Sequence, residues 1–366
     1  MKRILTLSIL TIIVLGLLTG CGAPATASQS GAAAAAGTQG STAASSGKQT
    51  GGATKITLGA YTTPREAYAK IIPLFKKSWK AQTGQDVTFA ESYLGSGAQS
   101  RAIVEGFEAD VAALSLEADI NNIVKAGLIT HDWKATPHNG IVSTSVVAFA
   151  VRPGNPKGIK DWSDLAKPGI NVLTPNPKTS GGAQWNIMAL YGAALRGNVA
   201  GVPKGDEAAA QEFMKKVLKN VSVMDKGARE SITTFEKGIG DVAITYENEV
   251  LVAQQKGEKL DLVLPHSSIL IENPIALVDK YVDKHGNRKA VEAFITFLFT
   301  PEAQKVFAET GGLRSIDPNV AKETASRYPA VPDLFTIKDF GGWSQVTPKF
   351  FGNSGIYTTA IGQVQK

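Results

Sequence analysis

The sequence predicts an α/β fold with two lobes, on three observations. Short apolar segments typical of strands alternate with amphipathic segments of helical spacing from residue 56 to residue 309. Turn-forming glycine, proline and asparagine residues lie between these segments. The chain from residue 55 onward is also too long for one simple hydrophobic core, which favours two lobes, each with a sheet flanked by helices.

The predicted elements follow one another in a regular order. The first strand, 56–60, leads into a helix over 64–81 that has apolar residues on one face and ends before Gly84, a residue suited to a left-handed helix end. Further strands are predicted at 87–90, 111–114, 145–151, 169–173, 222–224, 242–246, 260–264 and 275–278. Further helices are predicted around 103–107 and at 120–126, 162–165, 183–195, 206–218, 230–237, 247–255, 289–299 and 301–309.

The loop at 174–186 is the stretch that carries the strongest functional signal. It follows the strand 169–173 and leads into the next helix through Ser180, Gly181 and Gly182. Ser180 falls at the N-cap position, and the two glycines leave the first amides of the helix unobstructed. Because these amides are unpaired and lie at the positive end of the helix dipole, an oxyanion can bind there without lysine or arginine. The alternative for this loop taken alone is structural: Ser180 caps its helix and the glycines shape a turn.

The same order of strand, short loop and helix start recurs elsewhere in the chain. It is found after Ser92 and, in a less regular form, after Tyr61 and after Asp225. In open α/β sheets such loops lie at the carboxyl ends of the strands, which is where ligands bind. Two lobes that face each other can therefore bring several helix N-termini to one small anion.

The N-terminus has the features of an export signal. Lys2 and Arg3 precede an apolar run over 4–18, and residues 1–20 are predicted to be a signal peptide. The sequence Leu-Thr-Gly-Cys at 18–21 resembles a bacterial lipobox, which implies that Cys21 carries lipid. Cys21 is the only cysteine of the chain, so an internal disulfide is excluded. Residues 21–54 consist mainly of Ala, Gly, Ser and Thr, and we expect them to form a disordered tether to a membrane.

Charge and motif content exclude several classes of function. The formal net charge is +6, and the basic residues are scattered, so nucleic acid is not an expected partner. The four histidines are isolated and lack metal-ligand spacing, and Ser180 lacks the Gly-x-Ser-x-Gly motif of hydrolases. We therefore expect no metal, no cofactor and no catalysis, and the chain is predicted to be a monomer.

Several separated motifs closely resemble the sulfate-binding proteins of bacterial ABC importers. They are Val-Arg-Pro-Gly-Asn-Pro-Lys-Gly-Ile at 151–159, Asn-Pro-Lys-Thr-Ser-Gly-Gly-Ala-Gln-Trp-Asn at 176–186, Gly-Ala-Arg at 227–229, Gly-Ile-Gly-Asp at 238–241, Glu-Asn-Glu at 247–249 and Phe-Gly-Gly-Trp at 340–343. The resemblance implies a type II periplasmic-binding-protein fold that closes on dehydrated sulfate in the cleft between its lobes. It also implies a permease as partner and a place outside the cytoplasm. We expect 55–140 with 265–345 to form lobe 1, 141–264 to form lobe 2, and 346–366 to form a C-terminal tail.

The resemblance also implies which residues hold the anion. Two arginines, Arg229 and Arg65, are predicted to support the site without touching the ligand. Tyr246 is a departure, because the family has a tryptophan donor there, whereas the molybdate-binding relatives use a tyrosine in a comparable role. The predicted ligand-binding residues are Thr62, Ser96, Ser180, Gly181, Gly182, Ala228 and Tyr246.

A pocket that contains only donors favours sulfate over phosphate. Sulfate carries no proton at neutral pH, whereas hydrogen phosphate carries one that finds no acceptor in such a pocket, at a cost of roughly 1–3 kcal/mol. We expect discrimination of at least about tenfold, which the Tyr246 hydroxyl can relax because it also accepts hydrogen bonds. The alternatives are another tetrahedral oxyanion, such as thiosulfate, molybdate, tungstate or phosphate, or a lipid-anchored sensor or adhesion lobe that has lost its ligand.

Overall fold

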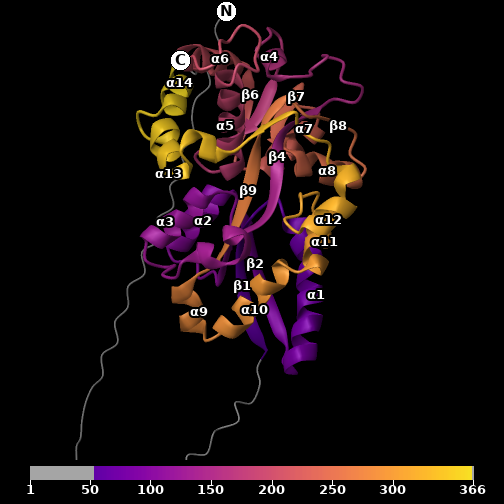
Figure 1. Cartoon of the computed structure of the whole chain (residues 1–366), viewed down its shortest axis with the longest axis vertical. Helices are drawn as coiled ribbons and strands as arrows, with labels where there is room; N and C mark the ends of the chain where they lie inside the picture. Colours follow the sequence, from indigo (N-terminus) through magenta and orange to yellow (C-terminus); the bar gives the residue numbers. More distant parts are fainter. Residues whose placement is uncertain (1–52, 365–366) are drawn as a thin grey trace, which may run out of the picture. The chain divides into compact units, whose positions relative to one another are not determined.

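The computed structural model describes residues 53–364, so the predicted signal peptide 1–20, Cys21 and nearly all of the tether 21–54 lie outside the described residues. The described part begins with a parallel sheet (Figure 1). Its strands are β1 (Thr54–Tyr61), β2 (Val87–Leu94) and β3 (Val111–Ala113), with β1 in the centre. The helices that follow these strands are α1 (Arg65–Thr83), α2 (Ser96–Val104) and α3 (Glu117–Lys125). We call this sheet and its helices the first lobe.

The second lobe is built around another group of strands. Its strands are β5 (Val172–Pro175), β6 (Val221–Asp225), β7 (Val242–Tyr246) and β8 (Asp261–Val263). Its helices are α4 (Trp162–Leu165), α5 (Gly181–Leu195), α6 (Glu207–Lys219), α7 (Ala228–Glu236) and α8 (Glu247–Gln255). The prediction of strands alternating with helices is confirmed, and short loops lead from β5 into α5 and from β6 into α7.

Two long strands join the lobes. β4 (Ile141–Val151) pairs through Ile141–Val146 with β9 (Ser267–Leu277) and through Val147–Val151 with β7. β9 continues in the other direction to pair with β3, so one sheet path runs β2-β1-β3-β9-β4-β7-β5-β6. Figure 1 shows both strands passing from the group around β1 to the group around β7.

The predicted lengths of these two strands are too short. The sequence predicts strands at 145–151 and 275–278, whereas β4 begins at Ile141 and β9 at Ser267. Small polar residues explain the difference, because they suggest a loop but are buried here with their hydroxyls bonded. Ser268 donates to the Val147 carbonyl at 2.7 Å, and Ser267 donates to Asp333 at 2.6 Å.

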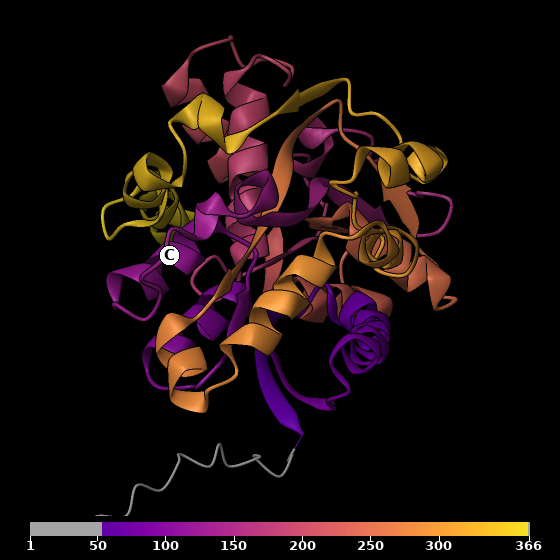
Figure 2. The same cartoon turned by 60° about the horizontal axis from the view of Figure 1, so that its bottom comes forward.

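The last third of the chain covers both lobes. α9 (Asp279–His285), α10 (Arg288–Leu298) and α11 (Pro301–Glu309) follow β9, and α1 packs against α10 and α11. They are followed by α12 (Pro318–Glu323), β10 (Asp333–Phe335), α13 (Trp343–Val346) and α14 (Ile356–Val364). Short turns of 3-10 or π helix cover Trp133–Ala135, Pro137–Gly140, Ala325–Arg327, Ile337–Phe340 and Thr347–Phe351. In Figures 1 and 2, α13 and α14 lie on the opposite flank of β4 and β9 from α11 and α12.

Each lobe has its own hydrophobic core. In the first lobe, Tyr68 and Phe75 of α1 pack against Phe294 of α10. In the second lobe, the buried Trp185 of α5 is the centre of a cluster that includes Trp343 in an edge-to-face contact. The end of the chain, through Tyr357, is buried in this second cluster. Tyr61 and Leu116 of the first lobe also belong to this second cluster, so the lobes pack against each other beside the site.

Candidate functional site

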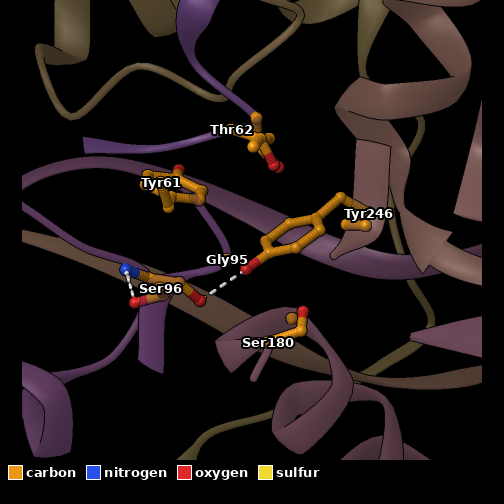
Figure 3. A pocket seen from close by; sticks show the side chains of 10 residues that line it. Tyr61, Thr62, Gly95, Ser96, Ser180 and Tyr246 are labelled. Atoms are coloured by element: carbon orange, nitrogen blue, oxygen red, sulfur yellow. Dashed lines mark hydrogen bonds between the residues drawn. The ribbon is translucent and has the colours of Figure 1, made fainter. Parts of the chain in front are cut away.

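The starts of several helices meet at one small cavity between the lobes. The first lobe contributes the loop after β1, the start of α2 and the loop after β3, and the second lobe contributes the starts of α5 and α7 and the end of β7. The cavity has a volume of about 10 Å³, measured as the space open to the centre of a water-sized sphere, which is about what one water molecule needs. Figure 3 shows its lining, which consists of Tyr61, Thr62, Thr63, Gly95, Ser96, Ser115, Ser180, Gly182, Ala228 and Tyr246.

Glycine at position 95 allows three of these loops to touch. A Cβ on Gly95 would lie 2.5 Å from the Thr179 carbonyl oxygen and 2.9 Å from that of Lys226, which is closer than real Cβ atoms approach. The Ala98 amide donates to the same Thr179 carbonyl at 3.2 Å. The N-terminus of α2 is therefore packed directly against the loops that lead into α5 and α7.

The first amides of these helices are free to bind a ligand. Among the described residues, no protein acceptor is recorded for the backbone N–H of Ser96, Gly182 or Ala228, each of which lies in the first turn of its helix and lines the cavity. All three residues are buried. A buried N–H without a partner costs free energy, so these amides favour an anion that accepts from them.

Ser180 can serve as cap and ligand group together. Its Oγ accepts a hydrogen bond from the Ala183 amide at 3.3 Å, which confirms the predicted N-cap. The hydroxyl proton of this buried serine has no recorded protein acceptor within residues 53–364. A hydroxyl can accept and donate at the same time, so the structural role predicted as the alternative does not exclude the ligand role.

Tyr246 reaches across the cavity to the first lobe. Its hydroxyl lies 2.6 Å from the hydroxyl of Ser115, and a dashed line from the Tyr246 hydroxyl marks this bond in Figure 3. Burial raises the pKa of Tyr246 well above its ordinary value, so the hydroxyl keeps its proton. The Ser115 amide in turn donates to Ser96 Oγ at 2.9 Å, which links the loop after β3 to the start of α2.

A buried acid fixes the Ser96 side chain. The Ser96 hydroxyl donates to Asp119 Oδ2 at 2.6 Å, so this hydroxyl is already used and only the Ser96 amide is free for a ligand. Burial raises the pKa of Asp119 to about 6, although the hydrogen bond from Ser96 works in the opposite direction. Asp119 does not line the cavity.

Neither of the two predicted supporting arginines lines the cavity. Arg229 donates to Glu249 at 2.6 Å, to Glu66 at 2.6 and 2.9 Å, and to the Thr63 carbonyl. Arg65 lies over the ring of Tyr93, 4.6 Å from its centroid. None of the ten residues that line the cavity has a cationic side chain.

The structure brings most of the predicted ligand-binding residues together. Gly181 is not part of the lining, but a Cβ there would lie 2.7 Å from Ser115 Oγ, so it is in direct contact with a lining side chain. Sequence reasoning missed Tyr61, Thr63, Gly95 and Ser115. The position of Ser115, directly after the β3 region at the carboxyl end of a parallel strand, is the signal that could have identified it. The remaining predicted residues, which all line the cavity, are Thr62, Ser96, Ser180, Gly182, Ala228 and Tyr246.

Metal ligands and membrane-spanning helices can be assessed for residues 53–364, the part of the chain that the structure describes. No group of three or more histidine, cysteine or acidic side chains has an arrangement that could hold a metal ion in this part of the chain. None of its helices is long and apolar enough to cross a membrane.

Comparisons with known proteins point to one family. A family model described as bacterial extracellular solute-binding protein matches residues 56–312. The chain is 49% identical over 304 residues to the sulfate-binding protein of Synechococcus elongatus, covering 83% of this chain and 85% of the relative. It is 38% identical over 304 residues to the thiosulfate-binding protein of Pseudomonas aeruginosa, covering 81% of this chain and 89% of the relative.

The same likeness extends to a solved structure. The sulfate-binding protein SubI from Mycobacterium tuberculosis superposes with a TM-score of 0.75 at 39% sequence identity. The match covers 81% of this chain and 99% of SubI.

Proposed function

The chain belongs to the bacterial extracellular solute-binding proteins, and on that basis we propose that it captures sulfate between its two lobes and delivers it to the permease of an ABC importer. The single observation that carries this proposal is the cavity lined by free helix amides from both lobes and by no cationic side chain. Backbone N–H groups only donate, and a fully deprotonated tetrahedral dianion accepts at each of its oxygens.

The predicted binding residues have distinct roles in this proposal. The amides of Ser96, Gly182 and Ala228 donate to sulfate oxygens, and the Ser180 hydroxyl adds a further donor. Thr62 and Gly181 lie close enough to contribute their own amides. Tyr246, together with Ser115, supplies a hydroxyl proton in place of the family's indole N–H.

Capture requires that the lobes open and close. β4 and β9 are the strands that take part in both halves of the sheet, so we propose that bending at these strands moves the lobes. Contacts between the lobes, such as that of Arg229 with Glu66, stabilise the closed form. A permease that recognises only the closed form then receives loaded protein.

The remaining parts of the proposal concern location and chemistry. We propose that the chain acts outside the cytoplasm as a monomer, tethered through residues 21–54 to lipid on Cys21 after removal of residues 1–20. The relatives are named as binding proteins, which supports our proposal that this chain binds its ligand without converting it to a product. Thiosulfate is the second candidate ligand, because one relative with 38% identity carries that name.

Thermal unfolding of the full chain in the presence of different anions tests the proposal. A ligand that binds only the folded state stabilises it by about 2.7 kcal/mol at a hundred times its dissociation constant. We expect sulfate to raise the melting temperature at concentrations where phosphate does not, with thiosulfate, molybdate and tungstate measured in parallel. A sulfate-ester hydrolysis assay should show no turnover. No stabilisation by any of these anions would contradict the proposal and favour a lobe that has lost its ligand.

A further inference from the structure

Ser115 and Tyr246 form a pair of hydroxyls inside the cavity. Their oxygens lie 2.6 Å apart, and both residues line the cavity. Their relative exposures are 0% and 1%, so both side chains are buried. One partner follows β3 in the first lobe and the other ends β7 in the second.

The pair lies directly against the start of α5. A Cβ on Gly181 would lie 2.7 Å from Ser115 Oγ, and a Cβ on Gly182 would lie 2.5 Å from Tyr246 Cε2. The absence of side chains at these two positions is therefore what admits the pair. An anion bound to the first amides of α5 lies next to both hydroxyls.

The pair differs from the other donors of the cavity in what it can accept. Each hydroxyl has one proton and two lone pairs, and the bond between them uses one proton and one lone pair. No other hydrogen bond to either hydroxyl is recorded among residues 53–364. The pair is left with a single free proton, which either residue can carry, and with unused lone pairs.

Among residues 53–364, no other two hydroxyls of the lining are bonded to each other. The Ser180 oxygen accepts from Ala183, but its proton has no recorded protein acceptor within residues 53–364. Tyr61 Oη and Thr63 Oγ1 are buried without a hydrogen-bond partner in the same part of the chain. Each of these protons needs the ligand as its acceptor, so these groups act as donors.

We propose that the Ser115–Tyr246 pair admits a monoprotonated tetrahedral oxyanion, such as monohydrogen phosphate or arsenate, as a weaker ligand of this cavity. The ligand hydroxyl donates to Tyr246 Oη, Tyr246 donates to Ser115 Oγ, and Ser115 donates to a second oxygen of the ligand. Every proton in this ring has an acceptor. With sulfate, the free proton of the pair goes to a sulfate oxygen. The inference rests on the proposed function, because it assigns the ligand class of the same site.

Ser115 is essential to this arrangement because it accepts the Tyr246 proton. With alanine at position 115, Tyr246 can still donate to sulfate. It can accept from a protonated ligand only if its own proton finds another acceptor, and Ser115 Oγ is the one protein oxygen recorded within hydrogen-bond distance of the Tyr246 hydroxyl among the described residues. Ser115 is thus a specificity residue, and its removal should affect protonated ligands more than sulfate.

Titration calorimetry on the full chain tests this inference with sodium sulfate and inorganic phosphate at about pH 8, where phosphate is mainly the monohydrogen form. We expect the wild-type chain to bind both, with sulfate tighter by about tenfold or more. Ser115→Ala should raise the ratio of the phosphate Kd to the sulfate Kd by about another tenfold. Tyr246→Phe should raise the same ratio, because it leaves Ser115 without its partner.

A matched control uses another buried serine. The Ser100 hydroxyl donates to the Asp119 carbonyl at 2.7 Å and does not line the cavity, so Ser100→Ala should leave the ratio unchanged. The inference is overturned if the wild-type chain binds sulfate but no phosphate at millimolar concentration, or if Ser115→Ala leaves the ratio unchanged. Failure of the wild-type chain to bind any tetrahedral anion would instead contradict the proposed function.

Discussion

Arg229 and Glu66 join the two lobes through a two-pronged ion pair, with Nη1 to Oε1 at 2.6 Å and Nη2 to Oε2 at 2.9 Å. Arg229 follows Ala228, whose amide faces the cavity, and Glu66 lies in the first turn of α1. The pair therefore connects two of the segments that line the cavity, one from each lobe. It forms only when the two sides of the cavity meet.

Removal of this pair should weaken binding without touching the ligand. We expect Glu66→Ala to weaken sulfate binding by about 1–3 kcal/mol, because charged hydrogen bonds that stabilise the closed form are lost. Titration calorimetry measures the change. Lys256 contacts the same carboxylate but is half exposed, so Lys256→Ala should change affinity by at most about 0.5 kcal/mol. Equal effects of the two substitutions would show that the carboxylate does not act through Arg229.

The same carboxylate predicts how closure depends on pH. Burial alone would raise the pKa of Glu66, but the hydrogen bonds and charge of Arg229 outweigh it and lower the pKa to about 2. A lowered acid pKa gives stability that is present above the ordinary value of about 4.3 and is lost as pH falls through the lowered value. Sulfate affinity should therefore fall between about pH 4.5 and pH 2. In Glu66→Gln this decrease should be smaller, and an identical pH profile would contradict the prediction.

Ser180 gives a direct test of the ligand position. We expect Ser180→Ala to weaken sulfate binding by roughly 1–3 kcal/mol, the loss for a hydrogen bond to a charged group. The substitution also removes a helix cap worth about 1 kcal/mol of stability. Thr300→Ala removes an equivalent cap, at α11 in another part of the chain, and should lower stability without changing affinity. If affinity is unchanged in Ser180→Ala, the anion binds elsewhere.

Some local features of the site and of the fold could be predicted from the sequence. The N-cap at Ser180 follows from the order of strand, Ser-Gly-Gly and apolar helix, and the structure confirms it. The left-handed conformation of Gly84, with φ of 72°, was equally evident from its place after an amphipathic segment. Both depend only on neighbours in the chain.

Features that depend on how distant segments meet could not be predicted. Ser115 and Tyr246 are separated by 131 positions and belong to different lobes, so no local pattern indicates that their hydroxyls touch. The extension of β9 back to Ser267 depends on partners such as Val147 and Asp333 that accept from its serines. The contact of Trp343 with Trp185 likewise joins the end of the chain to a helix of the second lobe.

A crystal structure of the closed protein with bound sulfate tests the central claim most directly. We predict that the sulfate oxygens accept hydrogen bonds from the amides of Ser96, Gly182 and Ala228 and from the Ser180 hydroxyl, with Arg229 still bonded to Glu66. An anion held by the Arg229 guanidinium or by a lysine ammonium group would contradict the account.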